Sequence, residues 1–341
     1  MDSDKHQILK NFLASLPFEK KEVFEMSDMI LRDNNPHPIP YVETDGQTQN
    51  THDGQMKLLL ADEMSIMLGL LHICHKSDKT LADLQRHEGE AKVAVVVAGA
   101  APGDHFADLR DTFRFVDFHL YDPAPIGWCR SLQDSRKRRN VTLYKQYFTV
   151  KTAEEWQDKK QKRYEHVIFL CDLRTNTGNQ RFPSLDDVSA DMKNQKYITK
   201  TINACYSVLK FCPRYYDDTN PHAEDFLTLK YFDGTIFLQG YPTKTSTETR
   251  LHVTDTESEK EYDTLVYEKQ LFNHNQVTRN EKKRLFGPDN LSYDNAYARF
   301  VKEFLEQHLG ERRYNGQHRF EHERVRRVRA LLEEFRLLLI E

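Results

Sequence analysis

Two lysines and two acidic residues lie in stretches of the sequence that are otherwise apolar. They are Lys57 in GQMKLLL, Asp172 in FLCDLRTN, Lys210 in SVLKFCP and Glu248 in TSTETRL. Burying such charges is costly unless they pair with one another. If the four meet, desolvation and a neighbouring cation can lower the pKa of one lysine until it serves as a general base. Singly, each has an ordinary explanation, because lysines extend from helices into water and strands often end in an acid.

A second group of residues has the features of a nucleotide-like binding site. The stretch VVVAGAAPGDH, residues 95–105, is a β-branched run that stops at a small loop with Gly99 and Gly103. Glycine lets a ligand approach the backbone and readily adopts positive φ angles. Asp122 follows 19 positions after Gly103, at the end of the next predicted strand, where an acid commonly accepts hydrogen bonds from ribose hydroxyls. The loop is not the G-x-G-x-x-G of pyrophosphate sites, so the pattern favours S-adenosyl-L-methionine. The alternative is a tight strand–helix connection with an exposed aspartate.

The hydrophobic pattern predicts the scaffold that must position these residues. Residues 55–73 have helical apolar spacing, and a helix is predicted around 190–209, with Lys210 at its end. Continuous runs of Val, Ile, Leu and Phe between helices indicate a buried, mostly parallel sheet, and therefore a doubly wound α/β domain. In such a domain ligands bind beyond the carboxyl ends of the strands, where Gly99 and Asp172 are expected. The predicted strands are 92–98, 115–121, 141–148 and 166–171, followed by strands near 226–231, 235–239 and 249–254.

Composition excludes several classes of protein. The 341 residues are 38% hydrophobic, enough for one large core, and the formal net charge of −4 gives no overall field that attracts nucleic acid. The five cysteines form no C-x-x-C pair, which predicts reduced thiols and no zinc site. The sequence contains no run of about 18 apolar residues, so no membrane span is predicted. The start MDSDKHQILK lacks the apolar core of a secretory signal. We expect a soluble intracellular protein, in the cytoplasm or the nucleus.

The same stretches, taken in order, resemble a known family. GQMKLLL, GAAPGDH, YDP, VTLYKQYF, CDLRTN, SVLKFCP, TETRL and YEKQL, spread over residues 54 to 270, are similar to stretches of the poxvirus-type cap-specific mRNA (nucleoside-2′-O-)-methyltransferases. The poxvirus member of that family is also the small, stimulatory subunit of poly(A) polymerase. The resemblance implies a class I Rossmann-like methyltransferase fold with a seven-stranded sheet. It also implies S-adenosyl-L-methionine as cofactor and 5′-capped mRNA as substrate.

The resemblance gives roles to individual residues. Lys57, Asp172, Lys210 and Glu248 would form a catalytic tetrad in which Lys210 deprotonates the ribose 2′-hydroxyl, Lys57 and Asp172 steer that hydroxyl, and Glu248 holds the lysines. No metal is needed for this step. One departure is Ala124, because poxvirus members have an arginine two positions after the ribose-binding aspartate. The residues implied in cofactor binding are Gln55, Gly99, Ala100, Ala101, Gly103, His105, Asp122, Phe148, Asp172 and Arg174.

The resemblance also implies a pocket for the methylated guanine of the cap, built from two aromatic rings and two carboxylates. A positively charged purine stacks well on aromatic faces. Glu268 in YEKQL matches one carboxylate, and the stretch CPRYYDD offers Tyr215 or Tyr216 as a ring and Asp217 as the second carboxylate. Tyr41 in IPYVE could be the other ring. Ordinary packing is the alternative for these tyrosines.

RNA beyond the cap needs positive charge, and the sequence has two sets of candidates. One is the pair of basic runs Arg136, Lys137, Arg138 and Arg139 and Lys159, Lys160, Lys162 and Arg163, which are otherwise typical of solvated loops. The other consists of Arg174, Lys244 and Arg250, close in sequence to the tetrad residues.

Three segments are predicted: an N-terminal arm with short helices over residues 1–53, the methyltransferase domain over 54–275, and a helical C-terminal extension over 276–341. The tail has a single apolar helical seam surrounded by arginines. This seam either docks on its own domain or binds a partner helix, in a dimer or in a polymerase or capping assembly. Its residues are Val325, Val328, Leu332, Phe335 and Leu339.

Other functions fit parts of the pattern. A 2′-O-methyltransferase for another RNA or another cap position would share the tetrad. A non-catalytic RNA-binding subunit, such as a polymerase processivity factor, would have no need for an intact tetrad, although one chain can combine both roles. A small-molecule methyltransferase rarely needs two lysines with two acids.

Overall fold

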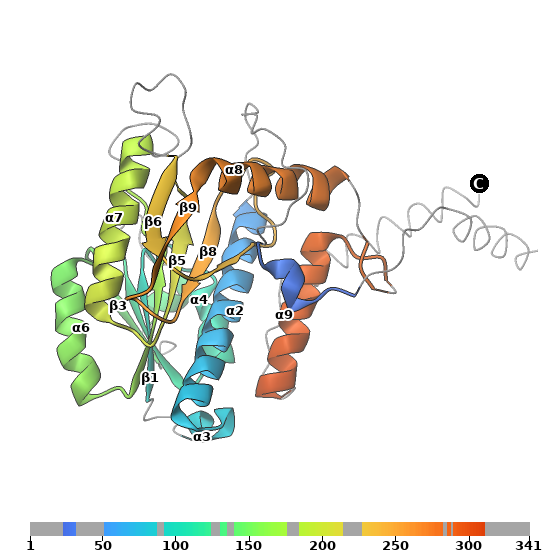
Figure 1. Cartoon of the computed structure of the whole chain (residues 1–341). Coiled ribbons are helices and arrows are strands. Elements are labelled where there is room, and N and C mark those ends of the chain that lie inside the picture. Colours follow the sequence, from blue (N-terminus) through green and yellow to red (C-terminus); the bar gives the residue numbers. More distant parts are fainter. Residues whose placement is uncertain are drawn as a thin grey trace, which may run out of the picture.

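The computed structural model describes residues 23–31, 51–86, 92–123, 130–134, 140–175, 184–213, 227–281, 285–287 and 289–310. Its centre is a seven-stranded sheet with the strand order β3-β2-β1-β4-β5-β8-β7 (Figure 1). The strands are β1 (Val93–Ala98), β2 (Val116–Tyr121), β3 (Val141–Tyr144), β4 (His166–Cys171), β5 (Tyr206–Phe211), β7 (Thr235–Phe237) and β8 (Thr249–Val253). Strands β1 to β5 pair in parallel, whereas β8 runs antiparallel to β5 and to β7. The predicted mostly parallel α/β sheet is therefore confirmed.

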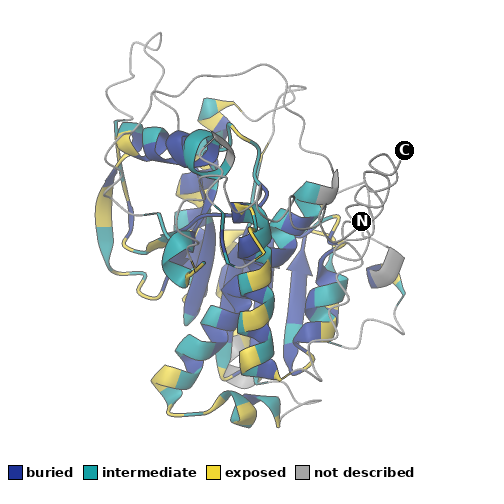
Figure 2. Cartoon of the chain, turned by 90° about the vertical axis from the view of Figure 1, so that its right-hand side faces the viewer, coloured by how far each residue is buried: buried dark blue, intermediate teal, exposed yellow. Residues whose placement is uncertain are grey.

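Helices cover both faces of the sheet. Alternate residues of β1 show the division, since Val95 belongs to a core with α2 (Thr51–Ser77), α4 (Phe106–Thr112) and α9 (Tyr293–Leu309). Val96 belongs to the opposite core with α6 (Val150–Lys162) and α7 (Leu185–Ile202). Figure 2 shows the buried strands between helices whose exposed residues face outward. The fold thus has the helix–sheet–helix layers of a Rossmann-like domain.

Shorter elements complete the described part of the chain. A two-stranded ribbon of β6 (Thr228–Phe232) and β9 (Glu259–Asp263) packs with the core on the α6–α7 side and leads into α8 (Thr264–Asn273). The remaining elements are the 3-10 helix η1 (Met26–Met29), α3 (Leu81–Gln85), α5 (Arg130–Gln133) and the π-helix η3 (His274–Glu281).

Helix α2 lies against the sheet along much of its length. By length and composition Asp53–Ser77 passes the test for a membrane-crossing helix, but 61% of its most apolar window is buried inside the molecule. Leu60 and Met67 are fully buried in the core that α2 shares with β1 and β4. The core helix of a soluble protein meets the same test, so we interpret α2 as a part of the scaffold.

The predicted helix around 190–209 is wrong after residue 202. Helix α7 starts with a capping box at Ser184 and ends at Ile202, where Asn203 adopts a left-handed conformation with φ of 45°. Such a C-cap stops a helix, and β5 then begins at Tyr206. Lys210 therefore lies on a strand. A short apolar run that is buried on both sides has no period that separates strand from helix.

The other predicted elements need smaller corrections. The strand predicted at 141–148 ends at Tyr144, and strands β6, β7 and β8 lie within two residues or so of their predicted positions. Helix α2 begins at Thr51, and strand β9 was not predicted. The predicted segment boundaries after residues 53 and 275 stay predictions.

Candidate active site

The register of the parallel strands brings the predicted site residues to one edge of the sheet. Ala98, the last residue of β1, pairs with Tyr121 of β2 on one side and with Cys171 of β4 on the other. Gly99, Asp122 and Asp172 each follow one of these residues, so all three leave the sheet side by side. This edge is where ligands bind in doubly wound folds.

The glycine loop is shaped first by the neighbouring backbone. Gly99 has a φ of +84°, and a Cβ there would lie 2.6 Å from the carbonyl oxygen of Asp172. Gly103 also has a positive φ, of +73°. The Ala101 amide donates a hydrogen bond of 3.0 Å to Oδ2 of Asp122. The tight turn is therefore required by the packing of β1 against β4, and the acid predicted to bind ribose also holds this loop.

The four tetrad residues meet in the structure. Nζ of Lys57 lies 3.1 Å from Oε1 of Glu248, and Nζ of Lys210 lies 3.1 Å from Oε2 of the same carboxylate. Nζ of Lys210 is also 2.9 Å from Oδ1 of Asp172. The two oxygens of Glu248 thus hold one lysine each, while Asp172 contacts Lys210 from the other side.

Two arginines join this cluster: the sequence suggested Arg250 as an RNA contact, and Arg174 as an RNA contact and as a cofactor-binding residue. Arg250 is buried, and its Nη1 donates a hydrogen bond of 2.9 Å to Oδ1 of Asp172. Arg174 lies 4.0 Å from Oε2 of Glu248. A signal for Arg250 was present, because residues two apart on a strand point to the same face and Glu248 directly precedes β8. Among the described residues, four cations therefore surround two carboxylates.

This arrangement sets the pKa values of the buried groups. Burial alone would lower the pKa of the Lys210 ammonium, but Asp172 and Glu248 outweigh burial, and the pKa lies above its ordinary value. Burial would raise the pKa of both acids, yet Arg250 and Lys210 lower that of Asp172 to about 2. Lys210 and Lys57 hold the pKa of Glu248 well below its usual range. The expected lowering of a lysine pKa is thus wrong for Lys210 in this structure, because two carboxylates contact the ammonium directly.

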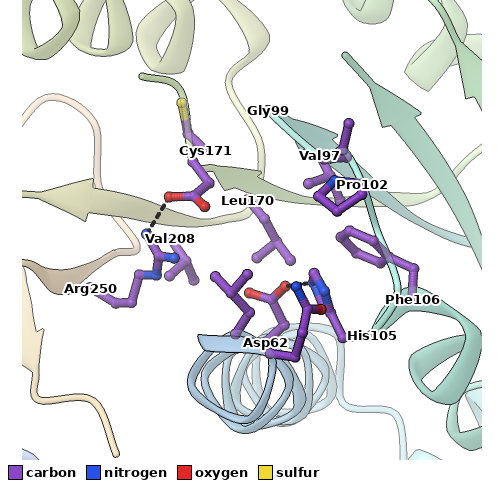
Figure 3. Close-up of a pocket in the computed structure, with 15 residues that line it drawn as sticks. Asp62, Val97, Gly99, Pro102, His105, Phe106, Leu170, Cys171, Val208 and Arg250 are labelled. Carbon is purple, nitrogen blue, oxygen red and sulfur yellow. Dashed lines mark hydrogen bonds and ion pairs between the residues drawn. The ribbon is translucent and has the colours of Figure 1, made fainter. Parts of the chain in front are cut away.

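A cavity opens between α2, the glycine loop and the ends of β4 and β5 (Figure 3). Its volume is about 40 Å³, and the space rises to about 460 Å³ when the open solvent at its mouth is included. The cavity adjoins the tetrad, because its lining includes Asp172 and also Arg250, which forms an ion pair of 2.9 Å with Asp172. The residues predicted to bind the cofactor that line it are Gln55, Gly99, Ala100, Ala101, His105 and Asp172.

Inside this cavity, two buried acceptor atoms lack a hydrogen-bond partner: Oε1 of Gln55 and Nδ1 of His105. Nε2 of His105 lies 3.0 Å from Oδ2 of Asp62, a residue that the sequence did not single out. If Nε2 donates to Asp62, Nδ1 is an acceptor. Buried polar atoms are usually hydrogen-bonded, so this end of the cavity suits a ligand with hydrogen-bond donors. A helical signal for Asp62 exists, since Gln55, Leu58 and Asp62 follow one another at steps of three and four residues on α2.

The other residues predicted to bind the cofactor do not line the cavity. The Asp122 carboxylate contacts the glycine loop by accepting a hydrogen bond from the Ala101 amide. Phe148 is buried in the core on the opposite face of the sheet, with its ring 4.9 Å from that of Tyr121. Gly103 turns the loop, and Arg174 faces Glu248. Within the described part of the chain, no group of three His, Cys, Asp or Glu side chains is arranged for a metal ion. The four cysteines described there are thiols.

Only one of the residues predicted to bind the cap is described. Glu268 is buried on α8. The residues outside the described ranges are Tyr41, Tyr215, Tyr216 and Asp217, the basic run Arg136–Arg139, and the seam residues Val325, Val328, Leu332, Phe335 and Leu339. The cap pocket therefore stays a prediction.

The second basic run makes contacts with the protein itself. Nζ of Lys159 lies over the rings of Trp156 and Tyr144, 5.3 and 5.7 Å from their centroids. Arg163 is 3.2 Å from Asp117. The side chains of Lys160 and Lys162 lie outside the described part. For Lys159 and Arg163 these contacts favour a structural role.

Comparison with known proteins relates this chain to a family. Residues 39–326 match the family model described as "Poly A polymerase regulatory subunit". Two similar proteins are named cap-specific mRNA (nucleoside-2′-O-)-methyltransferase, one from Myxoma virus strain Lausanne and one from strain Uriarra. Each is 27% identical over 265 residues, covering 71% of this chain and 66% of the relative. The matched part thus spans just under two thirds of these relatives' length.

Proposed function

This chain belongs to the poly A polymerase regulatory subunit family, and we propose that it is a cap-specific mRNA 2′-O-methyltransferase that uses S-adenosyl-L-methionine. The methyl group would pass to the ribose 2′-hydroxyl of a cap-proximal nucleotide. One observation carries the proposal. Lys57, Asp172, Lys210 and Glu248 form one continuous ion-paired cluster beside a cavity at the carboxyl edge of the sheet.

The lining of the cavity fits the proposed cofactor. Oε1 of Gln55 and Nδ1 of His105 have no hydrogen-bond partner, Nδ1 is an acceptor when Nε2 donates to Asp62, and an α-ammonium group offers donors. Asp122 lies where an acid commonly binds ribose. When bound, S-adenosyl-L-methionine supplies an electrophilic methyl group on a positively charged sulfur.

The tetrad residues would prepare the oxygen that is methylated. Lys210, once it has lost its own proton, accepts the proton of the 2′-hydroxyl at Nζ. Asp172 and Lys57 orient that hydroxyl, and Glu248 fixes the separation of the two lysines. Orientation of reacting groups contributes roughly 7–11 kcal/mol in well-placed intramolecular reactions, so a rigid cluster can supply much of the rate.

The excess of cations in the cluster supports an RNA substrate. Four basic side chains surround two carboxylates, so the site attracts anionic groups. Lys244 is exposed on the loop that precedes Glu248 and adds to this charge. A phosphodiester beside the reacting ribose would bind these cations.

The test uses radiolabelled S-adenosyl-L-methionine and a short RNA with a 7-methylguanosine cap. We expect label on a ribose 2′-oxygen with wild-type protein and none with Lys210→Ala. Lys230→Ala, an exposed lysine on β6, is the matched control and should retain full transfer. Label on RNAs with different penultimate nucleotides would identify the methylated position. No transfer by wild type with a series of capped and uncapped RNAs would refute the proposal.

The family description favours a second role, as a regulatory subunit in polyadenylation. A protein partner would be a polymerase or a component of the capping machinery. A Lys210→Ala variant that binds capped RNA normally but no longer methylates it separates the roles. If it still stimulates tail extension by a cognate polymerase, the chain has both functions.

A further inference from the structure

The loop that carries Glu248 has a backbone that needs support from outside. It joins β7 to β8 over residues 238–248. Tyr241 in this loop has a φ of 58°, in the left-handed region of the backbone that residues other than glycine rarely adopt. The side-chain hydroxyl of Tyr241 donates a hydrogen bond of 3.0 Å to Asn295 on α9. The shape of the loop therefore depends on elements that follow it in the chain.

Arg279 of the π-helix η3 lies at the centre of that support. Its side chain is 5% exposed and forms a two-pronged ion pair with Asp294, at 3.1 Å from Nε to Oδ1 and 2.9 Å from Nη2 to Oδ2. Nη2 also donates to the Pro242 carbonyl, at 3.2 Å, and Nη1 donates to Oδ1 of Asn275, at 2.9 Å. A lysine could not make these contacts, because it lacks the planar fork of donors.

The partners of Arg279 extend the contacts to both ends of the loop. Oδ1 of Asp294 accepts a hydrogen bond of 2.9 Å from the Tyr241 amide. Nδ2 of Asn275 donates a bond of 2.6 Å to the Ser246 carbonyl. The Ser246 hydroxyl then accepts from the Glu248 amide, at 3.3 Å. One guanidinium is thus connected to the loop at Tyr241, at Pro242 and at Ser246, two residues before the tetrad glutamate.

We propose that Arg279 is a positioning residue that acts, through Asp294 and Asn275, to hold the Glu248 carboxylate between Lys57 and Lys210. The inference rests on the proposed function of the tetrad. Glu248 contacts each lysine with a different oxygen, at 3.1 Å in both cases. A carboxylate that must satisfy two lysines at once tolerates little movement, so its backbone has to be fixed on both sides.

The charge of Lys210 reports the position of Glu248. The charged groups around Lys210 come from three elements. Asp172 and Arg174 follow β4, Glu248 directly precedes β8, and Arg250 lies on β8. Lys57 on α2 contacts the same Glu248 carboxylate as Lys210. Asp172 and Glu248 raise the pKa of Lys210. If Glu248 moves away, the remaining balance of charges is more positive, and the pKa of Lys210 must fall.

The experiment compares Arg279→Lys with Arg299→Lys in the full-length protein. Arg299 is an exposed arginine on α9 that pairs with Asp289 and Glu303, so it controls for the loss of a guanidinium fork. The pKa of Lys210 is measured by carbon-13 NMR on lysine-labelled protein, with the resonance assigned by Lys210→Met. Methyl transfer gives kcat, calorimetry gives the Kd for S-adenosylhomocysteine, and thermal unfolding gives the melting temperature.

We expect Arg279→Lys to lower the pKa of Lys210 and to reduce kcat roughly 10- to 100-fold, the cost of a small misplacement in an active site. The Kd for S-adenosylhomocysteine should stay within about twofold, because no residue of the cofactor cavity belongs to this network. Arg299→Lys should change none of these values. An unchanged pKa of Lys210 in folded Arg279→Lys overturns the inference, whatever happens to kcat.

A second variant covers the case in which Arg279→Lys does not fold. Asn275→Ala removes the connection from Arg279 to Ser246, while the contacts of Arg279 with Asp294 and Pro242 stay in place, and it should give the same direction of change at Lys210. If Lys210 titrates as in wild type, the inference fails. If wild type shows no methyl transfer to any RNA, the proposed function fails, and the pKa of Lys210 still decides whether Arg279 positions Glu248.

Discussion

Lys210 and Arg250 are cross-strand partners in the antiparallel ladder between β5 and β8, and both contact the same oxygen of Asp172, each at 2.9 Å. Residues directly opposite in a ladder point to the same face of the sheet. The pairing therefore places a permanent cation beside the proposed base and fixes the acid between them. The following predictions start from this cluster and from the cavity next to it.

Loss of the buried arginine should destabilise the protein strongly. Arg250→Leu leaves Asp172 with Lys210 as its remaining cation in direct contact, and breaking a buried pair on one side costs about 3 kcal/mol or more. Urea unfolding should show this loss, and methyl transfer should fall with it. The comparison is Arg163→Leu, since Arg163 is mostly exposed and its pair with Asp117 is worth less than about 1 kcal/mol. Equal effects of the two substitutions would contradict the role of Arg250.

The pH dependence of the rate should distinguish two roles for Lys210. A base acts in its deprotonated form, and the raised pKa of Lys210 makes that form rare at neutral pH. If Lys210 takes the proton of the hydroxyl, kcat rises with pH across the range from 7 to 10 without a plateau. A rate that is flat over this range would show that Lys210 orients the hydroxyl as an ammonium. Asp172 and Glu248, with lowered pKa values, stay ionised throughout.

Asp62 should control recognition of the cofactor's ammonium group through His105. Asp62→Asn no longer enforces the tautomer that leaves Nδ1 as an acceptor, so we expect a loss of about 5- to 10-fold in affinity for S-adenosylhomocysteine, the value of one hydrogen bond. Calorimetry with the deaminated analogue should show almost no change between wild type and variant. Asp78→Asn, at an exposed position just after α2, is the control. A similar loss for both ligands would assign Asp62 a general structural role.

Two glycines with positive φ angles should respond differently to alanine. Gly99→Ala brings a Cβ to 2.6 Å from the Asp172 carbonyl oxygen, whereas a Cβ at Gly287 meets nothing within 4 Å. Both residues have positive φ, so a Cβ in this backbone conformation should lower the free energy of unfolding of each variant by about 1–2 kcal/mol. Gly99→Ala should lose about 1–3 kcal/mol more through overpacking. Equal melting temperatures of the two variants would show that β1 and β4 separate easily at this edge.

Buried histidines should make the fold sensitive to mild acid. Burial, and secondarily Arg250, lowers the pKa of His252 to about 3, and burial lowers that of His119 to about 3 as well. The unfolded chain binds protons at these residues below pH 6.5, while the folded chain does not, so stability is present above pH 6.5 and is lost as the pH falls toward 3.

Each histidine contributes up to about 1.4 kcal/mol per pH unit in this window. His252→Asn should therefore make the melting temperature less dependent on pH between 7 and 5, in contrast to the exposed control His75→Asn. An identical slope for His252→Asn and wild type would mean that His252 takes up its proton in the folded state.

Much of the fold and part of the site can be predicted from local sequence. The buried strands are apolar runs that stop at Gly99, Asp122 and Asp172, and in a parallel sheet such stops share one edge, so the position of the site follows directly. The four tetrad residues were found because a charge inside an apolar run is costly without a partner. These inferences need only neighbours in the sequence.

The sequence did not predict which element carries Lys210. Residues 204–211 are mostly apolar and have no clear period. They form a strand because the left-handed cap at Asn203 ends the preceding helix and because they pair with β4 and β8. The predicted lowering of its pKa was wrong for a related reason. The sign of the pKa shift depends on which charges contact the ammonium of Lys210 directly, and that is a property of the packed cluster.

The sequence by itself determined the kind of fold and the sheet edge at which the candidate site residues meet, because periodicity and buried charge are local properties. Tertiary structure decided the rest. Arg250 joins the tetrad through the register of β5 against β8, Asp62 meets His105 where α2 packs on the glycine loop, and Arg279 reaches the Glu248 loop from η3. Each of these contacts joins residues about 40 positions apart in the chain, and only packing of the whole core brings them together.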